Sequence, residues 1–381
     1  MGLTDEQRSL RESVRDLLRR HRPAPVDGAG DDDGADGEQA ALWRLLGDVG
    51  VAGLAVPERF GGAGAGPVEV AVVAEELGRV LAPAPFLGSA VLTTQAILRS
   101  SDTGACERLL PALAGGSAIG ALAWTGQEGG WDPCSAACLA AEQAGGGWTM
   151  TGEAHYVLDG DLAHVLIAAA ALPDGGVGLF GVDPGQPGTD RRRAPSMDQT
   201  RRLGVVRLAG AAGQPLASAA PAAPADQGAA LAGARDMACL ALAAEQAGAA
   251  AAALEQTVAY TGTRVQFGRP IASFQAISHR LAELHVRVES ARALAYHAAR
   301  VAGLGGAGTD PQVGLLAAAA KAYCSEALAA VAAEMIQLHG AIGATWEHDA
   351  HRYLKRAHGS AQLLGAPPAH LARIAATVID G

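Results

Sequence analysis

Two changes of hydrophobic pattern along the 381 residues constrain this chain more than any other feature. From residue 226 onward, apolar side chains recur at helical spacing over four long stretches, 235–264, 275–301, 311–338 and 350–364. Between residues 118 and 225, short apolar runs are separated by Gly, Asp and Pro, which is typical of strands joined by turns. A chain of this length exceeds one hydrophobic core of ordinary size, so the pattern predicts separate domains.

The residues before 118 are also expected to be helical. Thr4 and Gln7 form a capping box ahead of apolar residues at helical spacing, and helical patterning returns at 39–49, 68–81 and 89–113. Residues 23–37 hold five Asp, four Gly and two Pro, with few side chains to bury. This composition predicts a flexible acidic loop without a catalytic role.

These patterns predict an α+β chain of three domains. An all-α N-terminal domain spans 1–117, a middle β-barrel or sandwich domain spans 118–225, and a C-terminal four-helix bundle domain spans 226–381. Linker composition supports the second boundary, because Ala and Pro alternate up to residue 224.

Charge and cysteine content exclude several classes of protein. The formal net charge is −10 with a pI near 5.5, and Lys and Arg are scattered, so nucleic acid is not an expected partner. The N-terminus lacks a basic segment followed by an apolar one, and the longest apolar runs are interrupted by polar residues. We therefore expect a cytoplasmic protein without a membrane partner. Five dispersed cysteines predict neither a disulfide framework nor a metal site.

The segment 264–275 reads Arg-Val-Gln-Phe-Gly-Arg-Pro-Ile-Ala-Ser-Phe-Gln and joins two predicted helices. A rigid corner of this kind presents a guanidinium group, a flat aromatic ring and an amide, which suit the diphosphate and adenine of FAD. On the spacing alone, the alternative is a capped helical hairpin in which Arg264 makes a structural ion pair.

This segment resembles the C-terminal signature of the acyl-CoA dehydrogenase family, and the resemblance extends over nearly the whole chain. Residues 57–62 and 75–78 resemble the first domain of that family, 152–157 resembles a middle-domain strand, and 337–343 resembles a second adenosine-contacting stretch. The resemblance implies an FAD-dependent flavoprotein oxidoreductase that acts on CH–CH donors. Its substrate is implied to be an acyl thioester of CoA or of a carrier protein. The FAD site is implied to be completed by another subunit.

Position by position, the resemblance implies a set of FAD neighbours. They are Arg264, Phe267, Phe274, Gln275, Gln337, Gly340 and Ala341, with Thr125 and Tyr156 near the isoalloxazine ring. The sequence departs from the family at this ring. Residues 125–132 read Thr-Gly-Gln-Glu-Gly-Gly-Trp-Asp where the family has a loop like Thr-Glu-Pro-Gly-Ala-Gly-Ser-Asp, and Leu158 replaces a usual hydroxyl.

A second departure concerns the catalytic base. Family members remove the α-proton of the thioester with a glutamate, while the β-hydrogen leaves as hydride to the flavin. The resemblance puts that glutamate at Leu364, or at Ala238 in some members, and neither side chain accepts a proton. Asp236, Glu245 and His358 lie nearby in sequence and are the remaining candidates, each also interpretable as an ordinary polar group of a helix surface.

Three interpretations stay open at this point. The first is an FAD-dependent acyl thioester dehydrogenase with an unrecognised base, active as a homodimer or homotetramer. The second is a base-less subunit that pairs with a glutamate-bearing homologue and supplies half of each FAD or substrate site. The third is a non-redox enzyme of specialised metabolism on the same fold.

An electron-accepting flavoprotein is a further partner that the resemblance allows. A protein that binds no flavin is disfavoured, because Arg264, Gln275 and Gln337 are present together.

Overall fold

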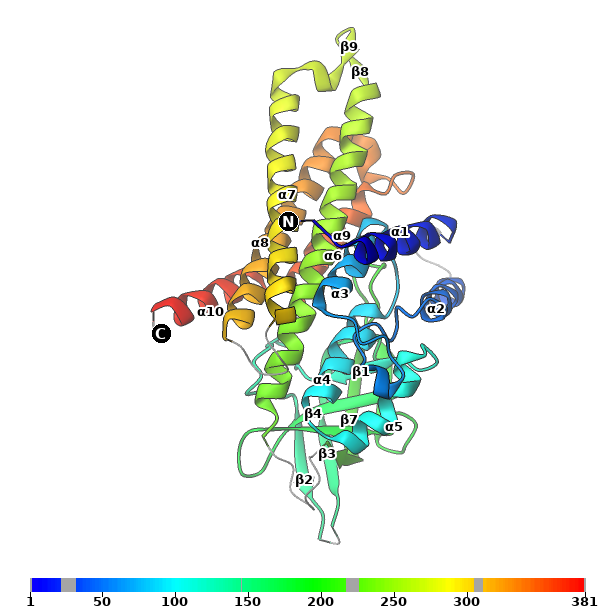
Figure 1. Ribbon diagram of the computed structural model, residues 1–381, viewed down its shortest axis with the longest axis vertical. Coiled ribbons are helices and arrows are strands. Elements are labelled where there is room, and N and C mark those ends of the chain that lie inside the picture. The colour runs from blue at the N-terminus through cyan, green and yellow to red at the C-terminus, as the bar shows by residue number, and fades with distance from the viewer. Residues whose placement is uncertain (1, 22–31, 145, 217–225, 305–310, 380–381) are drawn as a thin grey trace.

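The structure is a computed structural model that describes residues 2–21, 32–144, 146–216, 226–304 and 311–379 (Figure 1). Helices come first along the chain, strands follow between Gly120 and Pro215, and long helices form the rest. This order confirms the expected fold class of two helical regions flanking a β region.

The first helical region begins with α1, whose N-terminus has the expected capping box between Thr4 and Gln7. Its elements are α1 (Asp5–Arg20), α2 (Asp32–Asp48), the 3-10 turn η1 (Glu58–Phe60), α3 (Pro67–Arg79), the π-helical η2 (Phe86–Thr93), α4 (Thr94–Arg99) and α5 (Thr103–Ala114).

Helix α2 corrects part of the loop expected at 23–37. Its backbone is helical from Asp32, so residues 32–37 are not a loop, whereas 23–31 lie outside the described residues. The expected loop rests on the scarcity of side chains to bury in 23–37, which does not prevent a helix from beginning there. Acidic residues are favourable in a first helical turn, because the N-terminal end of the helix dipole is positive.

The β region is a barrel. Its strands are β1 (Gly120–Ala123), β2 (Cys138–Glu142), β3 (Trp148–Leu158), β4 (Val165–Ala171), β5 (Val177–Val182), β6 (Thr189–Arg193) and β7 (Leu203–Pro215). The pairings run from β4 to β2, β3, β7, β5 and back to β4, which closes a ring. Strand β1 extends the ring beside β4, and β6 beside β7. Met150, Leu166 and Phe180 fill its interior.

The second helical region is built on three long helices. Its elements are α6 (Gly228–Thr263), β8 (Val265–Gln266), β9 (Arg269–Pro270), the 3-10 turn η3 (Ile271–Ser273), α7 (Gln275–Leu304), α8 (Pro311–His339), the 3-10 turn η4 (Gly340–Ala344), α9 (Ala350–Gln362) and α10 (Pro367–Ile379). The sequence interpretation did not anticipate α10. Pro367 and Pro368 resemble helix breakers, but proline is well tolerated in the first helical turn, where its missing N–H has no partner to lose.

Two glycines bring the helical regions together. A Cβ on Gly78 of α3 would lie 2.0 Å from the carbonyl oxygen of Glu245, and one on Gly248 of α6 would lie 2.0 Å from that of Glu75. Helices α3 and α6 therefore touch backbone to backbone, and no larger residue fits at either position.

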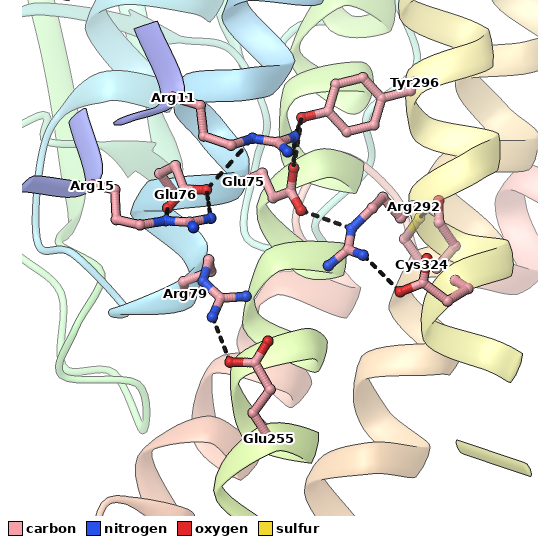
Figure 2. Close-up of polar contacts among 11 residues, drawn as sticks. Arg11, Arg15, Glu75, Glu76, Arg79, Glu255, Arg292, Tyr296 and Cys324 are labelled. Atoms are coloured by element: carbon pink, nitrogen blue, oxygen red, sulfur yellow. Dashed lines mark hydrogen bonds and ion pairs between the residues drawn. The ribbon is translucent and has the colours of Figure 1, made fainter. Parts of the chain in front are cut away.

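A buried network of charges joins the same regions (Figure 2). Glu75 of α3 is 3% exposed and accepts hydrogen bonds from Arg11 at 2.9 Å, Arg292 at 2.8 Å and Tyr296 at 2.6 Å. Its neighbour Glu76 accepts two hydrogen bonds from Arg15, at 2.6 and 2.8 Å. Each buried carboxylate is therefore neutralised by guanidinium groups from other helices.

Two helical stretches, Gly228–Thr263 and Pro311–Ala344, are long and apolar enough to cross a membrane by length and composition alone. The most apolar window of the first is 100% buried within the protein, and that of the second is 61% buried. Two such helices are weak evidence for a membrane span, because a buried core helix meets the same criteria.

Candidate functional site

The segment 264–275 forms a hairpin at one end of the molecule, beyond the tips of α6 and α7 (Figure 1). Strands β8 and β9 pair there, and the turn residues Phe267 and Gly268 have φ values of 53° and 80°. Two consecutive positive φ angles are the mark of a type I′ hairpin turn, in which glycine is favoured. The Phe267 side chain is left 92% exposed.

Aromatic and charged groups of this hairpin face solvent together. The guanidinium carbon of Arg269 lies 4.0 Å from the ring centroid of Phe274, and the rings of Phe267 and Phe274 meet edge-on at 6.2 Å. Arg264 and Gln275 are exposed. Across the described ranges Arg264 forms no ion pair, so the structural ion pair considered from the spacing is not present there.

The end of α8 lies beside the same tip of α6. Gln337, Gly340 and Ala341 are exposed, and Gly340 has a φ of 64°, as expected where a helix ends. The ring of His339 stacks on that of Tyr260, with centroids 4.2 Å apart, so the last turn of α8 contacts the last turns of α6. The seven residues expected near the FAD diphosphate and adenosine therefore gather at one end of the helical region.

The expected ring-side residues lie beside the barrel instead. A cavity of about 320 Å³, here called the ring-side pocket, is lined by Tyr156. Its other lining residues are Glu128, Gly129, Trp131, Leu203, Gly359, Gln362 and Leu363. Thr125 is buried and does not line it.

Both hydroxyl groups expected near the flavin donate to backbone carbonyl groups of the loop at 126–130. Thr125 Oγ1 donates to the carbonyl oxygen of Gly130, and the Tyr156 hydroxyl donates to that of Gln127 at 3.0 Å. Tyr156 also has a φ of 54°, a left-handed backbone angle that is uncommon for a large residue. The loop at 126–130 is thus tied down by the side chains that would otherwise face a ligand.

The two groups of residues are far apart within one chain. Gln246 on α6 donates to the hydroxyl of Ser360, which adjoins Gly359 of the ring-side pocket. From Gln246 to Arg264 at the end of α6 the helix extends about 27 Å, at 1.5 Å per residue.

The two positions expected to hold a glutamate are buried in apolar surroundings. Leu364 is 1% exposed and follows the C-cap of α9, Leu363, and Ala238 on α6 is fully buried. Both belong to the same hydrophobic core. Leu364 has a φ of 60°, so the chain turns sharply there.

Two of the three other candidates for the base are held in ion pairs, and the third does not line the ring-side pocket. Burial opposes the charge on Glu245, but Arg201 and Arg356 outweigh burial and hold the pKa of Glu245 below its usual value. Asp236 accepts hydrogen bonds from Arg373 at 2.7 and 2.8 Å and from Arg235 at 3.2 Å. His358 is exposed on α9 and does not line the ring-side pocket.

Sequence reasoning missed the residues that shape this pocket. Trp131, Gln362 and Leu363 line it, and Glu128 is the only acidic side chain among its described lining residues. The loop that carries Glu128 and Trp131 is the one whose sequence departs from the family pattern. That departure is the sequence feature that could have pointed to these pocket residues. Among the residues described, no group of three or more His, Cys, Asp or Glu could hold a metal ion.

Comparison with known proteins places this arrangement in a family. Residues 4–117 match the model for the acyl-CoA dehydrogenase N-terminal domain, and residues 229–379 match that for the C-terminal domain. Acyl-CoA dehydrogenase IpdE2 of Mycolicibacterium smegmatis is 39% identical over 378 residues, 99% of this chain and 100% of that protein. The fold and the site define a flavin-dependent dehydrogenase class, and the chain belongs to the acyl-CoA dehydrogenase family.

Two solved structures are also similar. A variant of the Tcur3481–Tcur3483 steroid ACAD has a TM-score of 0.84 at 30% identity, covering 99% of this chain and 98% of that one. The ChsE4–ChsE5 complex of Mycobacterium tuberculosis has a TM-score of 0.84 at 27% identity, covering 100% and 99%.

Dehydrogenation of acyl thioesters with FAD is the activity of this family, and it confirms the expected cofactor and the expected oxidoreductase class acting on CH–CH donors. The fold also resembles that of the butyryl-CoA dehydrogenase of Megasphaera elsdenii, with a TM-score of 0.88 at 24% identity, covering 100% of this chain and 99% of that one. A cytoplasmic location stays a prediction.

Proposed function

We propose that this chain is the base-less subunit of a heteromeric, FAD-dependent acyl-CoA dehydrogenase. It pairs with a glutamate-bearing homologue and lends its hairpin to the FAD bound by that partner. The observation that carries the proposal is the apolar burial of Leu364 and Ala238, together with the ion pairs that occupy Glu245 and Asp236.

The unequal state of the two flavin-binding regions supports this proposal. The hairpin presents Arg264, Phe267 and Gln275 to solvent, where a second chain can bring a flavin. The ring-side hydroxyls of Thr125 and Tyr156 instead donate to backbone carbonyl groups of the loop at 126–130. This combination of an exposed hairpin and occupied ring-side hydroxyls is expected of a chain that contributes half of a partner's FAD site and does not form a complete FAD site of its own.

The names of similar structures add support. Two of them are two-component assemblies, a Tcur3481–Tcur3483 steroid ACAD and a ChsE4–ChsE5 complex. A third is an electron-transferring flavoprotein structure of 22% identity, which bears on the fold alone. By analogy we propose an acyl thioester as substrate, carried by CoA or a carrier protein.

The chemistry of the hairpin follows from its groups. Bound FAD would supply the hydride acceptor. Arg264 can make paired, charge-assisted hydrogen bonds to phosphate oxygens, and the Gln337 amide can both donate to and accept from adenine. The exposed backbone at Gly340 leaves room for close approach, because glycine has no Cβ. These residues bind and orient, and none of them moves a proton.

One observation favours a second candidate, in which the chain is itself an active dehydrogenase. Glu128 lines the ring-side pocket together with Tyr156 and Leu363, and its carboxylate is exposed on the loop. A carboxylate there could accept the α-proton of a bound thioester if the loop moved with the substrate.

Stopped-flow bleaching of the oxidised flavin separates the two candidates. With a panel of acyl-CoAs, we expect the chain alone to react at least about 100-fold more slowly than its mixture with a glutamate-bearing homologue, since a positioned base contributes about 10²–10⁴-fold. Leu364→Glu in this chain should raise the rate of the chain alone if its own site is otherwise competent.

Glu128→Gln is the matched variant. Rapid bleaching by the unmodified chain that disappears in Glu128→Gln would establish the second candidate and end the base-less proposal. If the chain alone bleaches its flavin slowly, and Glu128→Gln leaves the bleaching rate of the mixture unchanged, the result would support the base-less subunit.

A further inference from the structure

Lys321 on α8 is fully buried, with 0% of its surface exposed. In the part of the chain that the structure describes, no carboxylate forms an ion pair with it. It is one of two lysines among the 29 basic residues of the chain, and the other is Lys355. A buried ammonium group without an opposite charge is unfavourable, so each of its N–H groups needs an acceptor.

Three neutral acceptors meet that need. Lys321 Nζ donates to Ser325 Oγ at 3.0 Å, to the carbonyl oxygen of Ala361 at 3.1 Å and to that of Gly365 at 3.2 Å. The Ser325 hydroxyl is itself held in place, because it also accepts from Gln246 Nε2 at 3.0 Å. An ammonium group has three N–H donors and a neutral amine has two, so only the protonated lysine can satisfy all three acceptors.

The two carbonyl acceptors lie on either side of residues that line the ring-side pocket. Ala361 is in the last turn of α9, and Gly365 follows in a sharp turn at 364–365, where the φ values are 60° and 110°. Gln362 and Leu363, between the two acceptors, line the pocket. The last carbonyl groups of a helix have no partner within it, so the buried ammonium group of α8 caps the end of α9.

The ionisable groups around this ammonium group supply no negative charge near pH 8. Burial raises the pKa values of the thiols of Cys239 on α6 and Cys324 on α8 to about 11 and about 12, so both stay neutral there. Arg201, ahead of β7, is positive, and burial lowers the pKa of His370 on α10 to about 4, so its ring is neutral. Burial lowers the pKa of Lys321 itself to about 8.

We propose that Lys321 is a positioning residue for the ring-side pocket, and that its ammonium group holds residues 361–365 in the shape that forms the pocket wall. When the ammonium group loses its proton, one of the three acceptors loses its donor. The left-handed backbone angle at Leu364, which is unfavourable for a residue other than glycine, is then held less firmly. The wall therefore loosens as pH rises through about 8. Both candidate functions include this wall, so the inference goes beyond the proposed function.

Two sets of NMR signals from the full chain test this inference. With ¹³C at the lysine Cε atoms, the chain gives one signal for each of its two lysines, and Lys355→Arg assigns them. With 5-fluorotryptophan, the signal of Trp131, assigned with Trp131→Phe, reports on the pocket that this side chain lines. We expect the Lys321 and Trp131 signals to shift together between pH 7 and pH 9, with one midpoint near pH 8.

Lys321→Met keeps an unbranched side chain and removes the charge. In this variant the Trp131 signal should already be displaced at pH 7 and should not shift further up to pH 9, whereas Lys355→Met, the matched control, should keep the shift of the unmodified chain. A Trp131 signal that shifts equally in Lys321→Met would overturn the proposal. So would a Trp131 signal that stays fixed while Lys321 titrates, and this result needs only the unmodified chain if Lys321→Met fails to fold. Neither measurement involves flavin or a thioester, so both are independent of the proposed function.

Discussion

Two arginine-rich regions of this chain differ in whether their charged groups are paired within the chain. Around Glu75 and Glu76, guanidinium groups from α1 and α7 meet buried carboxylates, and the contacts are completed within one chain (Figure 2). At the hairpin beyond α6, Arg264 and Phe267 face solvent and the described chain offers no ion pair to Arg264. The first region connects segments that are distant in sequence, and its charges are paired when the chain folds, whereas the hairpin leaves its charged and aromatic groups exposed.

The difference follows from burial. A carboxylate that is 2 or 3% exposed must be paired when the chain folds, because an unpaired buried charge is very unfavourable. An exposed guanidinium group stays hydrated, so the chain can fold without a bound ligand or an ion-pair partner for that group. The first region therefore serves the stability of this chain, and the second is free to serve a flavin and a second subunit. Two predictions test that division, and a third concerns a buried histidine outside both regions.

The largest effect is expected at the completed network. Glu75→Ala leaves Arg11, Arg292 and Tyr296 without their shared acceptor, and it should lower the free energy of unfolding by about 3 kcal/mol. Urea unfolding measures this change. Glu289→Ala is the control, because Glu289 pairs with Arg292 at the surface and should cost about 0.5 kcal/mol or less. If both variants had equal stability, the network would not hold the helical regions together.

A different kind of loss is expected at the hairpin. Arg264→Ala should remove FAD and dissociate the oligomer, while the free energy of unfolding of the single chain changes by less than about 0.5 kcal/mol. Flavin absorbance across a size-exclusion profile reports both losses, and urea unfolding reports stability. Arg108→Ala, at an exposed arginine of α5, should change neither. Full flavin occupancy in an intact oligomer of Arg264→Ala would exclude the hairpin as a flavin site.

The smallest effect on stability is expected from a fall in pH. Burial, followed by the charges of Lys321, Arg373 and Arg235, lowers the pKa of His370 to about 4, from the usual 6.5. The unfolded chain binds a proton at this residue below its ordinary pKa and the folded chain does not. Its contribution is therefore present above pH 6.5 and is lost as pH falls toward 4.

Other groups titrate in the same range, so the test is a difference between variants. Stability measured from pH 7 to pH 4 should fall less steeply in His370→Gln than in the unmodified chain. Identical slopes for the two proteins would mean that burial does not lower the pKa of His370 in the folded chain.

The sequence by itself determined the order of the regions and the position of the hairpin. Helical periodicity before 118 and after 226 follows from residue spacing, and the capping box at Thr4 and Gln7 is local, so both are readable without a fold. The hairpin at 264–275 needs only its own turn, with Gly268 at a positive φ. Helix α10 and the first turn of α2 were missed, because proline and aspartate act as breakers or as starters depending on position.

Only the tertiary structure determines which charged side chains are paired with one another and which line a pocket. Nothing in the spacing of Glu245 predicts that Arg201 and Arg356 enclose it, because those partners lie on distant segments. Nor does the sequence indicate that Glu128 faces a pocket, or that Arg99 and Arg373 meet beside Asp236. Periodicity is set by neighbours a few residues away, whereas the pairing of charges depends on how helices cross, as α3 and α6 do at Gly78 and Gly248.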